Sequence, residues 1–216
     1  MVDIAIPGQT NVADGGQAQM RAGRQSDLIV SQLHGRYYEN VSRGNVFTLN
    51  LTATTTGVAA GNINAAAAAA STQFAIWNPL TSGVNLSLLF MYNGITSGTI
   101  VGGPLFHNTF SGNLPTIASS GTATNCLVGA GNGPQAKFVA SAAGTALTGG
   151  SALSVIRPST IGYSAGTYAA LAGALAYEEI MGSLVIKPGA GWVPCFAAAG
   201  TSVLNTWGVV WEEVPV

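Results

Sequence analysis

The stretch that decides the fold class lies near the end of the 216-residue chain and reads GSLVIKPGAGWVPCFAAAGTSVLNTWGVVWEEV, residues 182–214. Its apolar runs are short and rich in β-branched and aromatic residues. They are separated by Pro188-Gly189 and by the small residues around Gly200. Runs of this composition between Gly and Pro turns predict β-strands rather than helices. The predicted strands are 182–187, 192–197 and 203–214.

Strand patterns recur through the rest of the chain between similar turns. Further strands are predicted at 28–33, 36–42, 45–52, 73–77, 84–92, 99–101, 105–110, 137–140 and 152–157. Apolar residues alternate with other residues in several of them, and Trp207, Val209 and Trp211 are predicted to share a core-facing side. Helix and strand both remain open for 167–180, because Ala, Leu and Glu favour a helix there. Many short strands with little helix predict an all-β protein, an antiparallel β-sandwich of jelly-roll type.

The domain organisation follows from composition. Residues 1–26 are rich in Gly and Gln and predict an extended N-terminal arm, while residues 27–216 predict a single β-sandwich domain. Two segments rich in small and polar residues, near 53–71 and 111–136, are predicted to be long loops. The first contains six consecutive alanines, which are too few to hold a helix alone.

Charged residues are scarce and unevenly placed. The chain has 7 basic and 8 acidic residues, and 8 of these 15 lie in the first 43 positions. None lies between Gly44 and Ala136. A net charge of −1 gives no electrostatic basis for binding nucleic acid or an anionic membrane. We expect much of the neutral surface to face other protein subunits, because surface charge normally opposes self-association.

The sequence also predicts the compartment and the state of the cysteines. The uncharged run 158–177 contains Pro, Ser, Thr and Gly and lacks a dense Leu/Ile/Phe centre, so it is a poor membrane helix. The first residues lack the pattern of a signal peptide, which predicts synthesis in the cytoplasm. Cys126 and Cys195 lie 69 positions apart and are predicted to be reduced and packed rather than bridged.

The residues that could carry catalysis do not form a plausible active site. Gly162-Tyr163-Ser164-Ala165-Gly166 matches G-x-S-x-G, but His34 and His107 both precede Ser164, which is the wrong order for a hydrolase. Gly129–Gly133 lacks the spacing of a phosphate loop. The pairs Glu178-Glu179 and Glu212-Glu213 are predicted at solvated strand ends, with the two members on opposite faces. We therefore predict no enzyme activity, no catalytic residue, no cofactor and no metal site.

Two groups of residues are candidates for binding. The first is the set of N-terminal arginines, which either belong to a solvated arm or dock on a neighbouring subunit: Arg21, Arg24, Arg36 and Arg43. The second is a set of aromatic residues that would form a sugar-binding platform if exposed: Tyr37, Tyr38 and Trp192. Core packing is the competing interpretation for the tryptophans.

The C-terminal strands carry a resemblance to a known family. Ser183–Gly189, then Trp192-Val193-Pro194, then Val209–Pro215 form a strand, a Pro-Gly turn, a strand, a small-residue turn and a final strand ending in Trp-Glu-Glu-Val. This order resembles the last strands of jelly-roll capsid decoration (cement) proteins of tailed bacteriophages. The resemblance covers about 33 residues, and the long arm and the loops near 53–71 and 111–136 depart from it.

The resemblance implies a virion structural protein on the capsid surface, assembled in the host cytoplasm. It implies a homotrimer whose partners are its own copies and the major capsid protein. We expect burial of uncharged surface between subunits, with the arm reaching a neighbour. Two alternatives remain open: a carbohydrate- or receptor-binding virion module, and a shell-forming single jelly-roll capsid protein.

Overall fold

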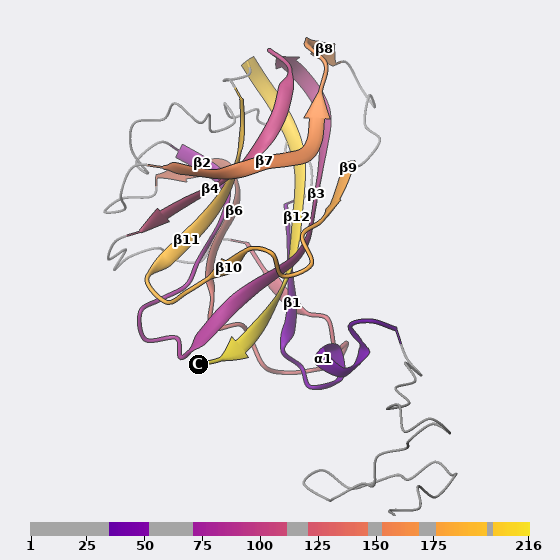
Figure 1. Cartoon of the computed structure of the whole chain (residues 1–216). Coiled ribbons are helices and arrows are strands. Elements are labelled where there is room, and N and C mark those ends of the chain that lie inside the picture. Colours follow the sequence, from indigo (N-terminus) through magenta and orange to yellow (C-terminus); the bar gives the residue numbers. More distant parts are fainter. Residues whose placement is uncertain (1–34, 52–70, 112–120, 147–152, 169–175, 198–200) are drawn as a thin grey trace, which may run out of the picture. The chain divides into compact units, whose positions relative to one another are not determined.

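The computed structural model describes residues 35–51, 71–111, 121–146, 153–168, 176–197 and 201–216. The chain divides into two compact units, Met1–Glu39 and Asn40–Val216. In the second unit, two antiparallel sheets pack as a β-sandwich (Figure 1), so the all-β prediction is confirmed. The predicted arm at 1–26, the strand at 28–33 and nearly all of the loop at 53–71 lie outside the described residues.

Over the described residues, the larger sheet has seven strands. Its main path is β10-β3-β12-β1-β5, and β8 and β9 also pair with β3. The strands are β1 (Val46–Leu51), β3 (Val84–Ile100), β5 (Ala123–Asn125), β8 (Gly166–Tyr168), β9 (Ala176–Glu179), β10 (Val185–Ile186) and β12 (Thr201–Pro215). Three short strands, β8, β9 and β10, therefore follow one another along the same side of the long strand β3. Short edge strands of this kind limit pairing with other chains.

In the part of the chain that the structure describes, the smaller sheet has five strands in the order β6-β2-β11-β4-β7. They are β2 (Ser71–Trp77), β4 (Gly103–Ser111), β6 (Lys137–Ala146), β7 (Ser154–Tyr163) and β11 (Ala190–Phe196). The strand β7 forms one edge of this sheet, and Pro158 lies in its middle. A proline is tolerated in an edge strand, because the side of the strand that faces solvent has no neighbouring strand to which an N–H would have to donate.

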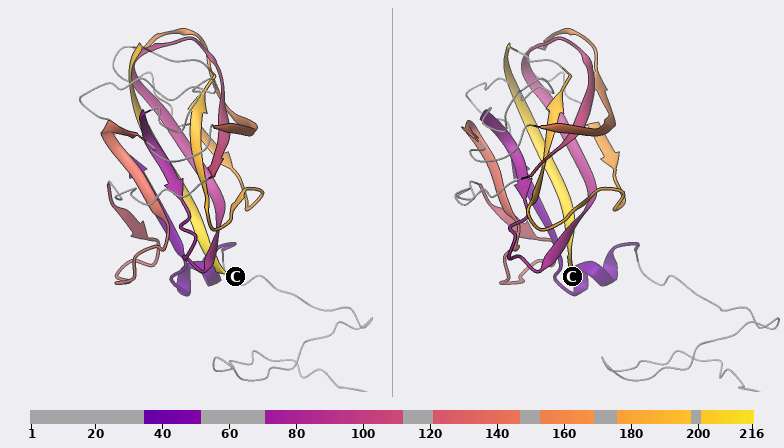
Figure 2. Two further views of the ribbon diagram at one scale, coloured as in Figure 1. Left: turned by 90° about the vertical axis from the view of Figure 1, so that its left-hand side faces the viewer. Right: turned by 60° about the vertical axis from the view of Figure 1, so that its left-hand side comes forward.

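The pairing of the strands is nested along the chain. β1 pairs with β12, β2 with β11, β3 with β9 and β10, and β4 with β7. Strands early in the chain thus pair with strands late in the chain. The long strands β3 and β12 also pair, and they run side by side in both views of Figure 2. This nesting is compatible with the predicted jelly roll.

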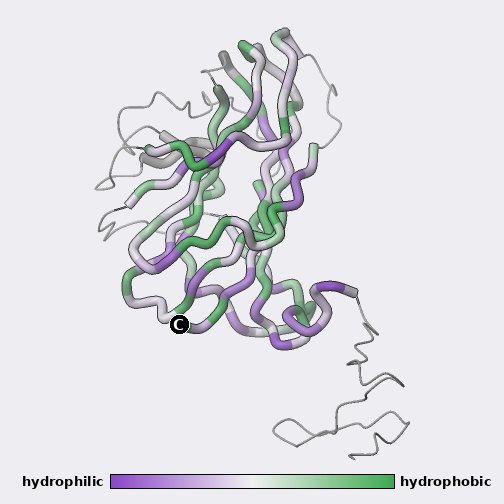
Figure 3. Tube along the Cα trace, in the orientation of Figure 1, coloured by the Kyte–Doolittle hydropathy of each residue, from purple (hydrophilic) through white to green (hydrophobic). Residues whose placement is uncertain are grey.

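The space between the sheets is filled by apolar side chains, many of them aromatic. Phe74 stacks on Trp207 with ring centroids 6.0 Å apart, and Phe47 stacks on Trp211 at 5.9 Å. All four side chains are buried, so the predicted core packing of Trp207 and Trp211 is confirmed. Figure 3 shows the hydrophobic segments concentrated in the strands. This burial is the main stabilising term of the sandwich.

The prediction of a strand at 36–42 is wrong, because a short helix α1 (Tyr38–Ser42) lies there. Two hydrogen bonds at its C-terminal end explain the difference. The N–H of Gly44 donates to the carbonyl of Val41 at 2.9 Å, and that of Asn45 donates to the carbonyl of Asn40 at 3.3 Å. Gly44 has φ = 73°, so these bonds form a Schellman cap with glycine in the left-handed region.

Two other segments also differ from expectation. The helical alternative for 167–180 is not found at either described end, because β8 and β9 pair there with β3. Tertiary pairing overrides the weak helical propensity of Ala and Glu. In the described part of the segment 111–136, the short strand β5 pairs with β1, whereas the residues that follow β5 form turns, bends and irregular structure as expected.

The outer face of the five-stranded sheet carries a second apolar cluster. Trp77 and Phe110 stack there with ring centroids 5.7 Å apart, although they belong to strands that are not neighbours. The strand between them, β11, places Gly191 opposite both residues. A Cβ atom on Gly191 would lie 2.1 Å from Cζ of Phe110, so the aromatic ring occupies the space of the missing side chain.

We expect the substitution Gly191→Ala to destabilise the protein by about 1–3 kcal/mol, because the new methyl group overpacks the Phe110 ring. Urea unfolding followed by circular dichroism measures the change. The matched control is Gly131→Ala, where a Cβ would meet nothing within 4 Å. Equal stability of the two variants would show that the ring does not need the glycine.

Candidate functional site

A cluster of polar side chains, all buried except the partly exposed Arg157, lies where β7 and β9 meet, at one flank of the sandwich. We call it the seam cluster; its members are His107 on β4, Arg157 and Ser159 on β7, Glu178 on β9 and Trp192 on β11. His107 is 0% exposed and Glu178 is 3% exposed. Because β9 belongs to the larger sheet and the other strands to the smaller one, the cluster joins the two sheets.

The carboxylate of Glu178 is the centre of the seam cluster. It accepts hydrogen bonds from His107 Nε2 at 3.1 Å, from the Thr160 N–H at 3.3 Å, and from the Ser159 hydroxyl. Arg157 Nη2 lies 3.4 Å from its other oxygen. A buried carboxylate is costly unless it is paired and hydrogen-bonded, and here donors from β4 and β7 satisfy it.

The hydrogen bonds determine the tautomer of His107. The indole Nε1–H of Trp192 can only donate, and it lies 3.1 Å from Nδ1 of His107. The Nδ1 atom must therefore accept, which leaves the ring proton on Nε2, where it points to Glu178. His107 is thus a neutral imidazole that accepts from one strand and donates to another.

Burial lowers the pKa of His107, and this effect outweighs the attraction of Glu178, which acts in the opposite direction; Arg157 lowers the pKa further. The neutral form is therefore favoured in the folded protein. This agrees with the tautomer that the Trp192 hydrogen bond requires.

A second buried carboxylate holds a loop against the end of the larger sheet. Glu213 Oε1 accepts from the Ala136 N–H at 3.0 Å and from Trp211 Nε1 at 3.4 Å. Its Oε2 accepts from the Gln135 N–H at 3.0 Å. Glu213 thereby anchors the segment that enters β6 at Lys137.

The prediction that both glutamate pairs are solvated is wrong for one member of each pair. Strand alternation does put the two members on opposite faces, as expected, but Glu178 and Glu213 are the buried members. Glu179 is exposed, and Glu212 is half-buried with Asn40 Nδ2 at 2.9 Å from its Oε2. The donors to Glu178 come from β4 and β7, and the two backbone donors to Glu213 lie just before β6.

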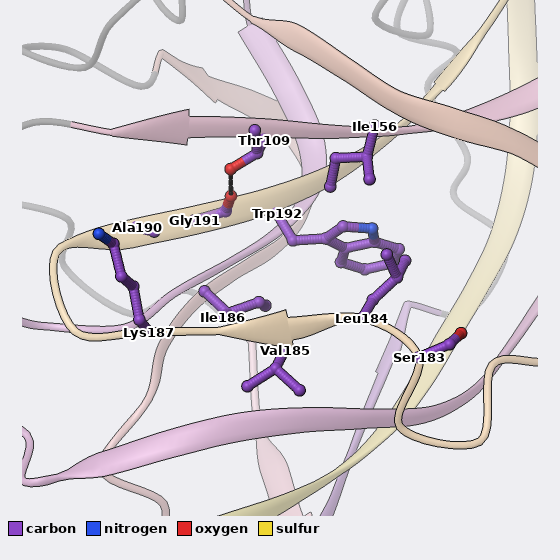
Figure 4. Close-up of a pocket in the computed structure, with 10 residues that line it drawn as sticks. All are labelled: Thr109, Ile156, Ser183, Leu184, Val185, Ile186, Lys187, Ala190, Gly191 and Trp192. Carbon is purple, nitrogen blue, oxygen red and sulfur yellow. Dashed lines mark hydrogen bonds between the residues drawn. The ribbon is translucent and has the colours of Figure 1, made fainter. Parts of the chain in front are cut away.

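An apolar groove, shown in Figure 4, shares the residue Trp192 with the seam cluster. Its volume is about 350 Å³, and Ile156, Leu184, Ile186 and Trp192 contribute apolar side chains to its lining. Lys187 is the charged residue among those that line it. Trp192 thus contributes both to the wall of this groove and to the seam cluster.

The described residues that are predicted to bind sugar or partners differ in their exposure. Trp192 is 1% exposed and lies in the core, so it does not meet the condition of exposure on which the predicted sugar-binding platform depends. Tyr38 is 51% exposed, and the Arg36 guanidinium lies 5.6 Å from the ring centroid of the half-buried Tyr37. Arg36 and Arg43 are exposed, whereas Arg21 and Arg24 lie outside the described residues.

The rejected catalytic strings lie in turns. Ser164 is exposed between β7 and β8, and its carbonyl accepts a hydrogen bond from the Tyr168 hydroxyl at 2.9 Å. Another strand follows this serine, whereas a nucleophile elbow leads into a helix. Gly129–Gly133 lies in a turn region, as expected.

Two kinds of feature are absent from the described part of the chain. There, no three His, Cys, Asp or Glu side chains gather closely enough to hold a metal ion. No helix in the same residues has the length and apolar composition needed to span a membrane.

Both cysteines are free thiols, as predicted. Cys195 is fully buried on the outer face of the five-stranded sheet, and burial raises the pKa of its thiol to about 12. Cys126 is half-buried, and burial raises the pKa of its thiol as well. Packing is therefore tight around Cys195 and looser around Cys126.

We expect the two thiols to differ in reactivity, because a thiol reacts as the thiolate and needs access to reagent. In native protein at pH 8, a disulfide reagent should modify Cys126 first and Cys195 only at the rate of unfolding. Mass spectrometry of the labelled peptides measures both rates. Fast native labelling of Cys195 would contradict its burial.

We expect Glu178→Ala to lower the free energy of unfolding by about 3 kcal/mol or more, because it leaves buried donors on His107 and Ser159 without their acceptor. The matched control is Glu179→Ala, the exposed neighbour on the same strand, which should cost less than about 0.5 kcal/mol. Urea unfolding measures both changes. A similar small effect for the two variants would show that the seam cluster does not stabilise the sandwich.

Comparison with protein-family models, with curated proteins and with solved structures finds no match to this chain. The resemblance of the C-terminal strands to phage decoration proteins therefore stays a prediction. The structure adds the arrangement of these strands: β10 and β12 flank β3 in one sheet, and β11 lies in the other.

Proposed function

We propose that this chain is a virion structural protein, a capsid decoration protein that binds the major capsid protein lattice as a homotrimer. The single observation that carries the proposal is a surface poor in charge that exposes large apolar side chains. Charge would normally keep such a surface in water, whereas its absence favours contact with other subunits.

The exposed apolar residues are spread over the described sandwich. Val128 is 96% exposed, Leu80 63% and Val101 62%, and all three belong to the segment Gly44–Ala136, which contains no charged residue. Others gather on β7, β9, β10 and the turn between the last two, near the apolar groove: Val155, Ile156, Tyr177, Met181 and Val185. Burying such side chains against other subunits contributes about 25 cal/mol per Å² of apolar surface.

The polar side chains of the sandwich support a structural role. Glu178, Glu213 and His107 are among its few ionisable groups, and they hold strands and loops together inside the protein. Such internal bracing suits a rigid module that binds through its surface. We infer that the exposed Arg36 and Arg43 take part in the proposed docking of the N-terminal arm on a neighbouring subunit.

The receptor-binding alternative loses its principal residue, since Trp192 is in the core. Of the predicted platform, Tyr37 and Tyr38 remain at least partly exposed. The shell-forming alternative shares the same fold, so only assembly behaviour separates it from decoration.

We expect the purified full-length chain to form a discrete trimer in solution and to cosediment with undecorated capsids of its source virus. Because the contacts bury neutral surface, the trimer should persist from 0.1 to 1 M NaCl. Sedimentation velocity measures the mass, and pelleting with capsids measures binding. Replacing Arg21, Arg24, Arg36 and Arg43 together by Ala should weaken pelleting but leave the trimer intact.

A matched control for the arginine variant is Lys137→Ala with Lys187→Ala, which removes positive charge outside the N-terminal segment. A stable monomer that does not bind capsids would overturn the proposal. Closed shells formed without any other protein would support the shell-forming alternative instead.

A further inference from the structure

The strand β9 is attached to the two sheets in different ways. Its backbone pairs with Phe90–Asn93 of β3, within the larger sheet. Toward the smaller sheet, Glu178 carries four polar contacts, to His107, Arg157, Ser159 and Thr160. This attachment between sheets therefore depends strongly on one buried carboxylate and on the state of the groups around it.

The closed arrangement requires a neutral His107. The indole N–H of Trp192 occupies the Nδ1 lone pair, and the Nε2 proton points to Glu178. A second ring proton would have to sit on Nδ1, where it would face the indole N–H. That protonation removes an internal hydrogen bond and places a full charge on a side chain with no exposed surface.

The charged groups around His107 oppose each other. Glu178 on β9 favours the imidazolium, whereas Arg157 on β7 disfavours it; Trp192 on β11 and Ser159 on β7 are uncharged. Burial is the largest effect, and the pKa of His107 lies below its ordinary value of 6.5. The attraction of Glu178, which also contacts Arg157, therefore does not compensate for the hydration that a protonated His107 would lose by being buried.

We propose that proton uptake by His107 opens the seam between β7 and β9, so that the sandwich has an acid-sensitive joint at this flank. In the open form, His107 is protonated and hydrated, and Glu178 leaves Ser159 and Thr160. The long ladder between β3 and β12 stays paired. Because Trp192 also lines the apolar groove, the groove changes shape when the joint opens. This inference does not depend on the proposed function in capsid decoration.

The direction of the pH dependence follows from proton binding. The closed form binds fewer protons at His107 than the open form, because its pKa is lowered. The closed form is therefore fully favoured above about pH 6.5 and loses its advantage as the pH falls below that value. For one proton, the opening constant rises by at most about tenfold per pH unit in this window.

Two hydrogens report directly on the joint. The Trp192 indole N–H is bonded to His107, and the Thr160 amide N–H is bonded to Glu178. We expect their NMR exchange protection factors, corrected for the intrinsic pH dependence of exchange, to fall between pH 7.5 and pH 5.5. The amide of Val209 in the β3–β12 ladder should keep its protection. The indole signal is assigned with Trp192→Phe.

The matched variants use the two histidines of the chain. His107→Gln keeps an amide donor for Glu178 but has no proton to gain, so the protection of Thr160 should become independent of pH in this window. His34→Gln should leave the response of the natural protein unchanged. If His107→Gln does not fold, the imidazole signals of the natural protein and of His34→Gln give the pKa of His107 directly.

Three results would overturn the inference. The first is protection at Thr160 and Trp192 that does not fall on acidification. The second is an equal loss at Val209, which would mean global unfolding rather than opening of one joint. The third is a pKa of His107 at or above 6.5 in the folded protein.

Discussion

The sandwich depends on the antiparallel ladder between β3 and β12, two long strands more than one hundred positions apart in the chain. The ladder runs from Val84 opposite Pro215 to Thr99 opposite Thr201, with irregularities near Val210 and near Leu204. β1 pairs with the other side of β12, and three short strands follow the other side of β3. β3 and β12 form the centre of the larger sheet, so their pairing fixes the positions of the core aromatics Trp207 and Trp211.

A shortage of charge shapes both the inside and the outside of the molecule. Glu178 and Glu213 are buried and serve as acceptors for donors on other elements. Buried ions are costly, but a fully partnered one ties distant segments into one arrangement, which apolar packing alone does less strictly. The described surface carries few charges, such as those of Arg43, Lys137 and Lys187, among neutral polar and apolar groups. The small number of charged residues therefore bears both on the proposed joint at the seam cluster and on the proposed contacts with other subunits.

Much of the architecture could be predicted because strand patterns are local. Five predicted strands are found in the structure, because alternating apolar residues between Gly and Pro turns favour a strand over other conformations. They are the runs around Val46, Phe74, Leu86, Leu105 and Trp192. The predictions failed where the structure depends on contacts from elsewhere or on a cap. Gly44 ends a helix at 38–42, and pairing with β3 makes 176–179 a strand.

By itself, the sequence determined the all-β class, the core role of Trp207 and Trp211, and a long segment without charge, because period and composition are properties of neighbouring residues. Only the tertiary structure decided that Trp192 is buried, that Glu178 lies inward, and that His107 is held neutral between an indole and a carboxylate. These three residues lie on different strands, up to 85 positions apart, and no local pattern records which donor will meet which acceptor. The chemistry of the seam is therefore a consequence of strand pairing.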